Sequence, residues 1–329
     1  MGLALCLVGW FLVFLLLLAF LLRPASENRG AVNYNHHNNN HTNQIYAPLP
    51  LNLREMVERL PGTRDLRKRR ALIFGLDYEG KDYELFGCIN DAHDMRQLLV
   101  SHYGFTEILL MTDRTKVRPT RGNMLAAMNW LVEGAQEGDS LVLHYSGHGD
   151  LHVSAGSSRK RGGYDDAIVP LDWETNGQIL DDTLYQHLVV PLRGRACLTA
   201  IFDSCHSGTG LDLKFNFRVN SRTRQLLAMP PDVRASIDAD VVLYSASLEG
   251  QTADDAVDEE TGRAYGALTN ALITTLARND YQISCGALLI QMDAVINRTS
   301  LQRPQMSSER KLNPSAPFTF LCNATQRSV

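Results

Sequence analysis

Short apolar runs alternate with amphipathic segments along the chain after residue 70. The apolar runs have the length of buried strands and lie at residues 71–76, 108–111, 140–145, 197–202 and 241–244. Helical periodicity is found at residues 90–102, 119–135, 180–190, 265–278 and 284–298. Asn90 is the expected N-cap of the first of these helices, and residues 51–60 are expected to form a short helix ahead of the sheet. Strands that alternate with helices predict an α/β fold, a mostly parallel sheet flanked by helices on both faces.

Two polar turns that contain glycine follow the third and fourth predicted strands. They are Ser-Gly-His-Gly at residues 146–149 and Asp-Ser-Cys-His-Ser-Gly at residues 203–208. Ligands bind at the carboxyl ends of parallel strands, so His148 and Cys205 would face each other if the two strands are neighbours. A thiolate beside an imidazole supplies a nucleophile and a proton donor for the amine that leaves a peptide bond. The pair predicts a cysteine peptidase with Cys205 as nucleophile and His148 as general base and acid.

Other interpretations of these residues stay open at this point. A lone cysteine at a strand end is most often a small buried hydrophobe, which fits Cys205 less well because its turn is polar and a second such turn ends another strand. His206 and His144 are rival bases. His206 is adjacent to the cysteine and would struggle to face it, and His144 is expected to pack within its strand.

Composition and charge narrow the class of protein. The chain has 329 residues, 44% hydrophobic and 21% charged, which is ordinary for a globular protein. Its net charge of −4 excludes a nucleic-acid binder driven by bulk charge. The six cysteines have neither CxxC nor zinc-ligand spacing, so we expect no disulfide framework, no zinc site and a reducing compartment: Cys6, Cys88, Cys197, Cys205, Cys285 and Cys322.

The N-terminal segment differs from the rest of the chain. Residues 2–22 carry no charge and are long enough to cross a bilayer, which predicts an uncleaved transmembrane anchor at residues 1–22. Arg23 and Arg29 place the following domain in the cytosol by the positive-inside rule. A luminal orientation stays open, because glycosylation sequons occur at three asparagines, Asn40, Asn297 and Asn323. Residues 23–60 are expected to form a polar linker rich in Asn and His, a flexible spacer rather than a metal site.

Several ordered blocks resemble one known family. His-Tyr-Ser-Gly-His-Gly at residues 144–149 and Phe-Asp-Ser-Cys-His-Ser-Gly at residues 202–208 look like the two signature blocks of the metacaspases, in the caspase-like clan of cysteine peptidases. Three further blocks agree in order, at residues 85–91, 177–182 and 303–308. The resemblance covers about residues 70–322, whereas the glutamine-alanine-cysteine signature of true caspases is absent.

The resemblance implies an organisation and an oxyanion hole. It implies a caspase-like sandwich in a peptidase domain at residues 61–329, with three parts: p20-like at 70–210, a linker loop at 211–236 and p10-like at 237–322. The backbone N–H groups of Gly149 and Cys205 would form the oxyanion hole, which is the kind of donor pair that a polar turn with glycine can present.

The resemblance also implies a substrate preference. Its primary specificity pocket would be lined by Cys88, Asp91, Ser146 and Asp203. Carboxylates recognise a cationic side chain, so the pocket implies cleavage after Arg or Lys. The residues alone leave simpler roles open, because Asp91 could be a helix N-terminal acid and Asp203 a turn former.

Acidic and basic groups suggest regulation. The resemblance implies a Ca²⁺ site at the positions of Asp165, Asp181, Asp182 and Asp212. Oxygen ligands suit calcium, but there is no EF-hand spacing, and the pattern alone favours solvated acids. Basic residues after the nucleophile predict either self-cleavage or a solvated loop: Lys214, Arg218, Arg222 and Arg224.

These observations together predict a calcium-dependent, membrane-anchored endopeptidase that acts as a monomer on protein or peptide substrates. A catalytically silent, membrane-tethered scaffold is the alternative from another class of protein, and the intact Cys205 and His148 argue against it. A peptidase specific for aspartate is disfavoured by the acidic pocket.

Overall fold

The computed structural model describes residues 49–62, 67–153, 164–192, 194, 196–205, 210–232, 237–247, 256–257, 261–298, 300 and 302–322. All of them fall within one compact unit, Tyr46–Val329. The predicted membrane anchor and residues 23–48 of the predicted linker lie outside these residues. In the part of the chain that the structure describes, no helix combines the length and apolarity needed to span a membrane.

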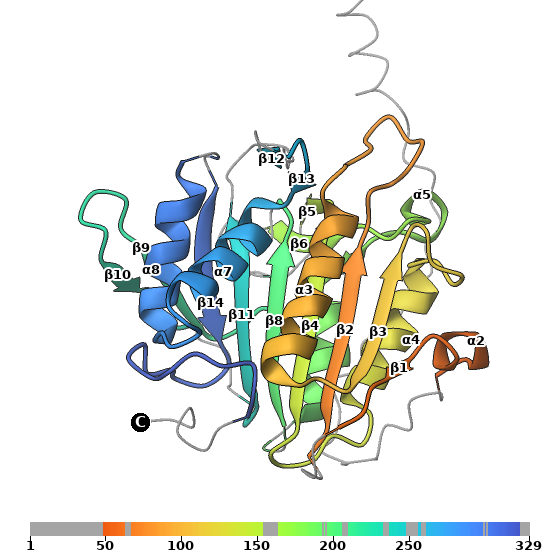
Figure 1. Cartoon of the computed structure of the whole chain (residues 1–329), viewed down its shortest axis with the longest axis horizontal. Coiled ribbons are helices and arrows are strands. Elements are labelled where there is room, and N and C mark those ends of the chain that lie inside the picture. Colours follow the sequence, from red (N-terminus) through yellow and green to blue (C-terminus); the bar gives the residue numbers. More distant parts are fainter. Residues whose placement is uncertain are drawn as a thin grey trace, which may run out of the picture. The chain divides into compact units, whose positions relative to one another are not determined.

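A nine-stranded sheet forms the centre, in the order β1-β3-β2-β4-β8-β11-β14-β9-β10. Its strands, in that order, are Glu58–Arg59, Glu107–Thr112, Arg69–Gly75, Ser140–Ser146, Cys197–Asp203, Asp240–Ser247, Arg303–Ser308, Phe215–Val219 and Leu226–Ala228. Strands β3, β2, β4, β8 and β11 run parallel to one another (Figure 1). The remaining strands, β1 at one end of the sheet and β14, β9 and β10 at the other, each run antiparallel to their neighbours. The predicted mostly parallel sheet is confirmed.

Helices cover both faces of the sheet. On the face nearer the viewer in Figure 1 lie α3 (Cys88–Tyr103), α7 (Ala267–Arg278) and α8 (Cys285–Ile296), and α4 (Arg121–Val132) lies behind. Every residue of β4 is buried, as expected for a parallel strand covered on both sides. Alternate β4 residues contribute to different core clusters, Val142 to the cluster with α3 and α7, and Leu143 to the cluster with α4.

Smaller elements lie outside the central sheet. The three-stranded sheet β5-β6-β7 was not predicted, and its strands β5 and β6 lie near the carboxyl ends of the parallel strands, as do α5 and the strand pair β12-β13 (Figure 1). The bounds are β5 Gly149–Val153, β6 Tyr164–Ile168, β7 Ile179–Leu180, β12 Ala256–Val257, β13 Ala264–Tyr265, α5 Trp173–Asn176, α6 Asp181–Leu184, a π-helical turn Tyr185–Val189 and a 3-10 turn Val190–Leu192. The chain that leaves β4 therefore continues directly as β5, which pairs antiparallel with β6.

Two predicted helix boundaries are wrong. The helix expected at residues 51–60 is the four-residue α2 (Leu51–Arg54), and β1 follows it. Helix α3 begins at Cys88, before the expected N-cap Asn90, because the Asp77 carboxylate accepts hydrogen bonds from the backbone N–H groups of Cys88 (2.9 Å) and Ile89 (3.2 Å). An N-terminus capped from another element leaves no local signal in the sequence.

The predicted linker loop at residues 211–236 also needs correction, because it contains the hairpin of β9 and β10. Phe215, Phe217 and Val219 alternate with polar residues, which is the pattern of a strand with one covered face. Strand β9 pairs with β14 and extends the central sheet.

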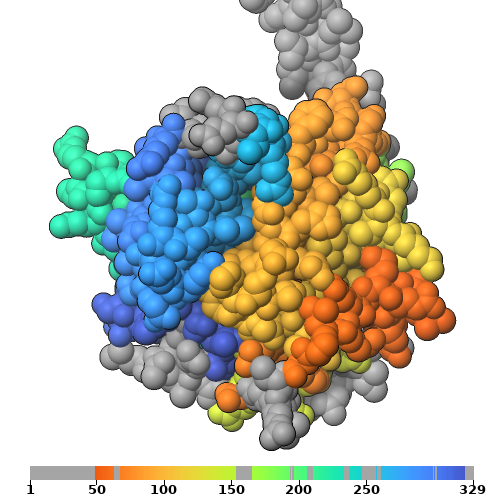
Figure 2. Space-filling model, viewed as in Figure 1, coloured from red at the N-terminus to blue at the C-terminus, as the bar shows by residue number. Residues whose placement is uncertain are grey.

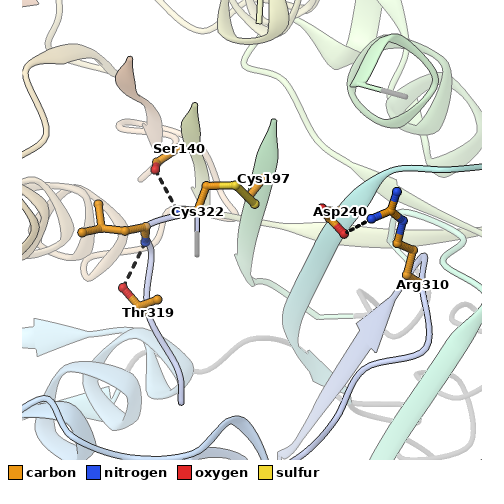
Figure 3. The surroundings of a disulfide bond; sticks show 7 residues. Ser140, Cys197, Asp240, Arg310, Thr319 and Cys322 are labelled. Atoms are coloured by element: carbon orange, nitrogen blue, oxygen red, sulfur yellow. Dashed lines mark hydrogen bonds and ion pairs between the residues drawn. A yellow bond between two sulfur atoms is a disulfide. The ribbon is translucent and has the colours of Figure 1, made fainter. Parts of the chain in front are cut away.

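One disulfide contradicts the expectation of reduced cysteines. Cys197 at the start of β8 is bonded to Cys322, 125 residues later (Figure 3). The backbone N–H of Cys322 also donates to Ser140 Oγ at the start of β4, at 2.9 Å. The two cysteines meet because the C-terminal segment comes back to the start of β8. Their separation in the sequence gives no sign of this pairing.

Cys322→Ser is expected to lower the free energy of unfolding by about 2–4 kcal/mol, because the disulfide restricts the unfolded chain. The measurement is chemical unfolding without reductant, with Cys285→Ser as a control at a free, buried cysteine. Wild-type protein in reductant should match Cys322→Ser. A wild-type stability insensitive to reductant would show that the bond does not form.

Candidate active site

The two predicted catalytic turns lie against each other. Strands β4 and β8 are neighbours, with Ser146 in register with Asp203, so their following turns leave the same edge of the sheet. A Cβ on Gly149 would overlap the carbonyl oxygen of Cys205, and only glycine allows this approach. Cys205 is buried, and residues 206–209, which include the rival base His206, lie outside the described residues.

His148 is held through both its ring and its backbone. Its Nε2 lies 2.7 Å from the carbonyl oxygen of Tyr83. Because a carbonyl only accepts, Nε2 carries a proton, and Nδ1 is the basic nitrogen of the neutral ring. The backbone N–H of His148 donates to Tyr78 Oη at 3.0 Å, and Tyr145 Oη donates to the His148 carbonyl at 2.6 Å. The imidazole therefore has a fixed tautomer and a fixed position.

Aromatic rings surround the imidazole. The ring centroid of His148 lies 4.7 Å from that of Tyr78 and 5.7 Å from that of Tyr83. Burial raises the pKa of Tyr78 and of Tyr145 well above the ordinary value. Both phenols therefore stay protonated at physiological pH and remain hydrogen-bond donors.

His144 is packed in the core, as predicted. It is fully buried in β4, and its Nε2 lies 3.0 Å from Thr269 Oγ1 on α7. Burial lowers the pKa of His144 to about 3, which keeps the ring neutral. It faces α7 and not the turn that carries Cys205, so it is no rival to His148 as the base.

Three of the four predicted pocket residues meet on the α3 side of the sheet. Asp91 lies in the first turn of α3 and Asp203 ends β8, and a Cβ on Gly266 would overlap a carboxylate oxygen of both. Ser146 Oγ donates to Asp91 Oδ2 at 2.7 Å. The fourth residue, Cys88, is buried one helical turn before Asp91.

The N-terminus of α7 contacts both carboxylates. The backbone N–H of Gly266 donates to Asp91 at 2.9 and 3.0 Å, and that of Thr269 donates to Asp203 Oδ2 at 2.7 Å. Burial raises the pKa of Asp91 well above its ordinary value, and the neighbouring Asp203 raises it further. A helix N-terminus carries partial positive charge, so it partly offsets the repulsion between the two acids.

The segments that lead into α3 and α7 also touch each other. A Cβ on Gly87, just before α3, would meet the backbone of Tyr265 at 2.8 Å. In Figure 2 the light-blue segment that leads into α7 abuts the orange segment that leads into α3. The two carboxylates are therefore covered on one side by residues that lie far downstream in the sequence.

The four predicted calcium ligands are only partly gathered. Asp181, Asp182 and Asp212 each offer a carboxylate oxygen, and these oxygens lie within 4.8 Å of one another. Asp212 has a left-handed backbone, with φ of 48°. Asp165 is outside this group, in β6, although its neighbour Asp166 donates a backbone N–H to Asp181 Oδ2 at 3.0 Å.

Sequence reasoning missed the residues that position the site. Tyr78, Tyr83 and Tyr145 hold His148, and Gly266 and Thr269 hold the carboxylates. Tyr145 stands in a signature block and could have been noticed. The others act through backbone groups or lie on distant elements, and no residue type or spacing marks such roles.

The chain is similar in sequence to known peptidases. Residues 69–214 match the family model described as metacaspase, peptidase C14 domain. Metacaspase-1 of Saccharomyces cerevisiae (strain YJM789) is 34% identical over 300 residues, which cover 76% of this chain and 68% of that protein. Metacaspase-1 of Cryptococcus neoformans var. neoformans serotype D is 33% identical, with coverage of 78% and 65%. Metacaspase-1 of Mycosarcoma maydis is 34% identical, with coverage of 76% and 73%.

A solved structure supports the fold independently. The crystal structure of a Geobacter sulfurreducens protein matches with a TM-score of 0.54 and 22% identity, covering 78% of this chain and 97% of that one. At that identity the match concerns the fold alone. The sequence matches go further, because they extend over most of the chain and include both turns that meet at Cys205 and His148. The chain belongs to the metacaspase family and is a cysteine-type peptidase.

Proposed function

We propose that this peptidase is a calcium-dependent endopeptidase that cleaves after Arg or Lys, with Cys205 as nucleophile and His148 as general base and acid. The observation that carries the proposal is the contact between the turns of β4 and β8, beside a pair of buried carboxylates. Protein substrates follow from the family. The cationic preference follows from the chemistry of the pocket.

The geometry supports a thiolate–imidazole mechanism. Nδ1 of His148 takes the thiol proton of Cys205, because Nε2 is bonded to a carbonyl. The thiolate attacks the substrate carbonyl carbon, and the oxyanion accepts hydrogen bonds from the backbone N–H groups of Gly149 and Cys205. Each such donor contributes about 3–4 kcal/mol in the transition state. His148 then protonates the leaving amine, and water hydrolyses the thioester with His148 as base.

The carboxylates of Asp91 and Asp203 suit a cationic side chain. A guanidinium or ammonium group bound between them would relieve their repulsion and lower the pKa of Asp91 from its raised value. Bidentate pairing favours Arg in particular. An aspartyl side chain would add a third negative charge to the same buried space.

Asp181, Asp182 and Asp212 fit a calcium ion. They are hard oxygen donors, and their carboxylate oxygens lie close enough together to share one ion. Bound there, Ca²⁺ would neutralise the acids and fix the loop after β8 to α6. Asp165, one residue from a backbone donor to Asp181, would join as a fourth ligand only after a shift of β6.

We also propose membrane anchoring through residues 2–22, whose apolar character supports it. Disulfides persist in oxidising compartments. The Cys197–Cys322 bond therefore favours a luminal peptidase domain over the cytosolic one that Arg23 and Arg29 predict.

Self-cleavage remains a proposal for the basic stretch. Arg218 lies in a paired strand, with its side chain on Gln305, and Arg224 is paired with the buried Asp293. Arg222 is exposed in the turn between β9 and β10 and is the most accessible of the four basic residues to a second enzyme molecule.

Cys205→Ala should abolish cleavage of an arginyl peptide by removing the nucleophile. Fluorogenic release from that peptide is the measurement. Cys285→Ala is the matched control, because burial raises the pKa of that thiol and keeps it unreactive, and its activity should persist. Activity in the Cys205 variant would refute the mechanism. Inactive wild-type protein in calcium would favour the scaffold alternative.

Asp91→Asn should lower kcat/KM for arginyl peptides about tenfold to a hundredfold, because one charged hydrogen bond to the substrate is lost. It should also raise the melting temperature. The folded pKa of Asp91 lies above its ordinary value of 3.8, so the folded state loses stability as pH rises through that window, and asparagine removes the penalty.

The control is Asp94→Asn, one turn later on α3, where an exposed ion pair with Arg263 is lost. That variant should keep wild-type kinetics. Stability of Asp91→Asn that falls with pH as steeply as in wild type would contradict the assignment.

Asp181→Asn with Asp182→Asn should abolish stimulation by calcium and the rise in melting temperature that calcium gives wild type. Ligand at 100 times its dissociation constant stabilises a protein by about 2.7 kcal/mol. Asp94→Asn with Asp280→Asn makes the same charge change on the surface and should respond like wild type. An unchanged calcium response in the first double variant would place the metal elsewhere.

A further inference from the structure

We propose that Tyr83 is a positioning residue for His148, and that its phenol is the anchor which fixes its own backbone carbonyl against the imidazole. The inference rests on the proposed Cys205–His148 pair. It adds Trp173 and Glu174 of α5 as the groups that hold this anchor.

The carbonyl of Tyr83 belongs to a loop between β2 and α3, not to a regular element. It accepts the His148 Nε2 hydrogen bond at 2.7 Å. Such a bond orients an imidazole only as well as the loop itself is held, because a loop backbone has no ladder of hydrogen bonds to restrain it. The loop has backbone hydrogen bonds of its own, from the Leu85 N–H to the Asp77 carbonyl (2.7 Å) and from the Glu84 N–H to the Lys81 carbonyl (3.1 Å), and a restraint from outside the loop would fix the Tyr83 carbonyl further.

The side chain of Tyr83 supplies it. Trp173 Nε1 donates to Tyr83 Oη at 2.9 Å, and Tyr83 Oη donates to Glu174 Oε1 at 3.1 Å. These directions are required, because an indole only donates and a carboxylate only accepts. The rings of Tyr83 and Trp173 also meet edge to face, with centroids 6.2 Å apart. The hydroxyl therefore accepts one hydrogen bond and donates another, and both partners lie on the short helix α5, about 90 residues later in the chain.

Glu174 is kept ionised for this role. Lys81 Nζ lies 3.2 Å from Glu174 Oε2, and that hydrogen bond, followed by the one from Tyr83, lowers the pKa of Glu174 below its ordinary value. Lys81 stands in the same loop as Tyr83, two residues earlier. The loop is therefore bonded to α5 at two residues, Lys81 and Tyr83.

Tyr83 touches the imidazole in two ways. Its ring meets that of His148 edge to face, with centroids 5.7 Å apart, and its carbonyl accepts from Nε2. Without the hydroxyl bonds to α5, ring and carbonyl can shift together, and the imidazole is held less well in the orientation that takes and returns a proton. The loss should fall on kcat, because Asp91 and Asp203 belong to other elements, α3 and β8.

Tyr83→Phe tests this directly, because it removes only the hydroxyl and leaves the ring and the carbonyl. We expect kcat on an arginyl peptide to fall about tenfold, with KM changed less than about twofold. The matched control is Tyr281→Phe, which removes an exposed hydroxyl bonded to His102 and should behave as wild type.

Glu174 gives a second test that does not depend on the folding of Tyr83→Phe. Glu174→Gln keeps an acceptor for the phenol and should retain most activity, whereas Glu174→Ala should reproduce the fall in kcat with little change in KM. A wild-type kcat in both Tyr83→Phe and Glu174→Ala would overturn the inference. Equal losses in Glu174→Gln and Glu174→Ala would overturn it too, because only the alanine removes the acceptor. Activity in Cys205→Ala would instead overturn the proposed mechanism, so the two failures are distinguishable.

Discussion

The in-register pairing of β4 with β8 is the constraint on which the rest of the site depends. Both strands are buried along almost their whole length, and Ser146 stands opposite Asp203 at their common edge. Because side chains alternate along a strand, a slip by one residue would send every one of them to the other face. The buried faces therefore specify the register, and the register brings Gly149 onto the backbone of Cys205.

The same alternation lets one strand serve two purposes. His144 and Ser146 of β4 point to the side of α3 and α7, where Ser146 contacts Asp91. Tyr145 points to the opposite side and reaches the carbonyl of His148 and the backbone of Val169. The contact with the Asp91 carboxylate and the support of His148 thus come from adjacent residues on opposite faces of the sheet.

The two buried carboxylates, Asp91 and Asp203, come at a cost to stability. Two carboxylates buried together are unfavourable, and burial and mutual repulsion both raise the pKa of Asp91. The N-terminus of α7 offsets part of this through the N–H groups of Gly266 and Thr269. A partial charge of about half a unit cannot neutralise two carboxylates, which leaves electrostatic attraction for an incoming cation.

The sequence by itself determined the fold class and the chemical identity of the site. Apolar runs of strand length between amphipathic segments specify a covered parallel sheet, and polar turns with glycine mark where its strands end. Cys205 and His148 were identifiable because a nucleophile and a base must be particular residue types. Only the tertiary structure decided the rest: the Asp77 cap of α3, the hairpin of β9 and β10 in the sheet, the pairing of Cys197 with Cys322, and the carbonyl of Tyr83 on the imidazole. These features join backbone groups or residues far apart in the chain, and any residue type has a carbonyl to offer, so no local pattern records them.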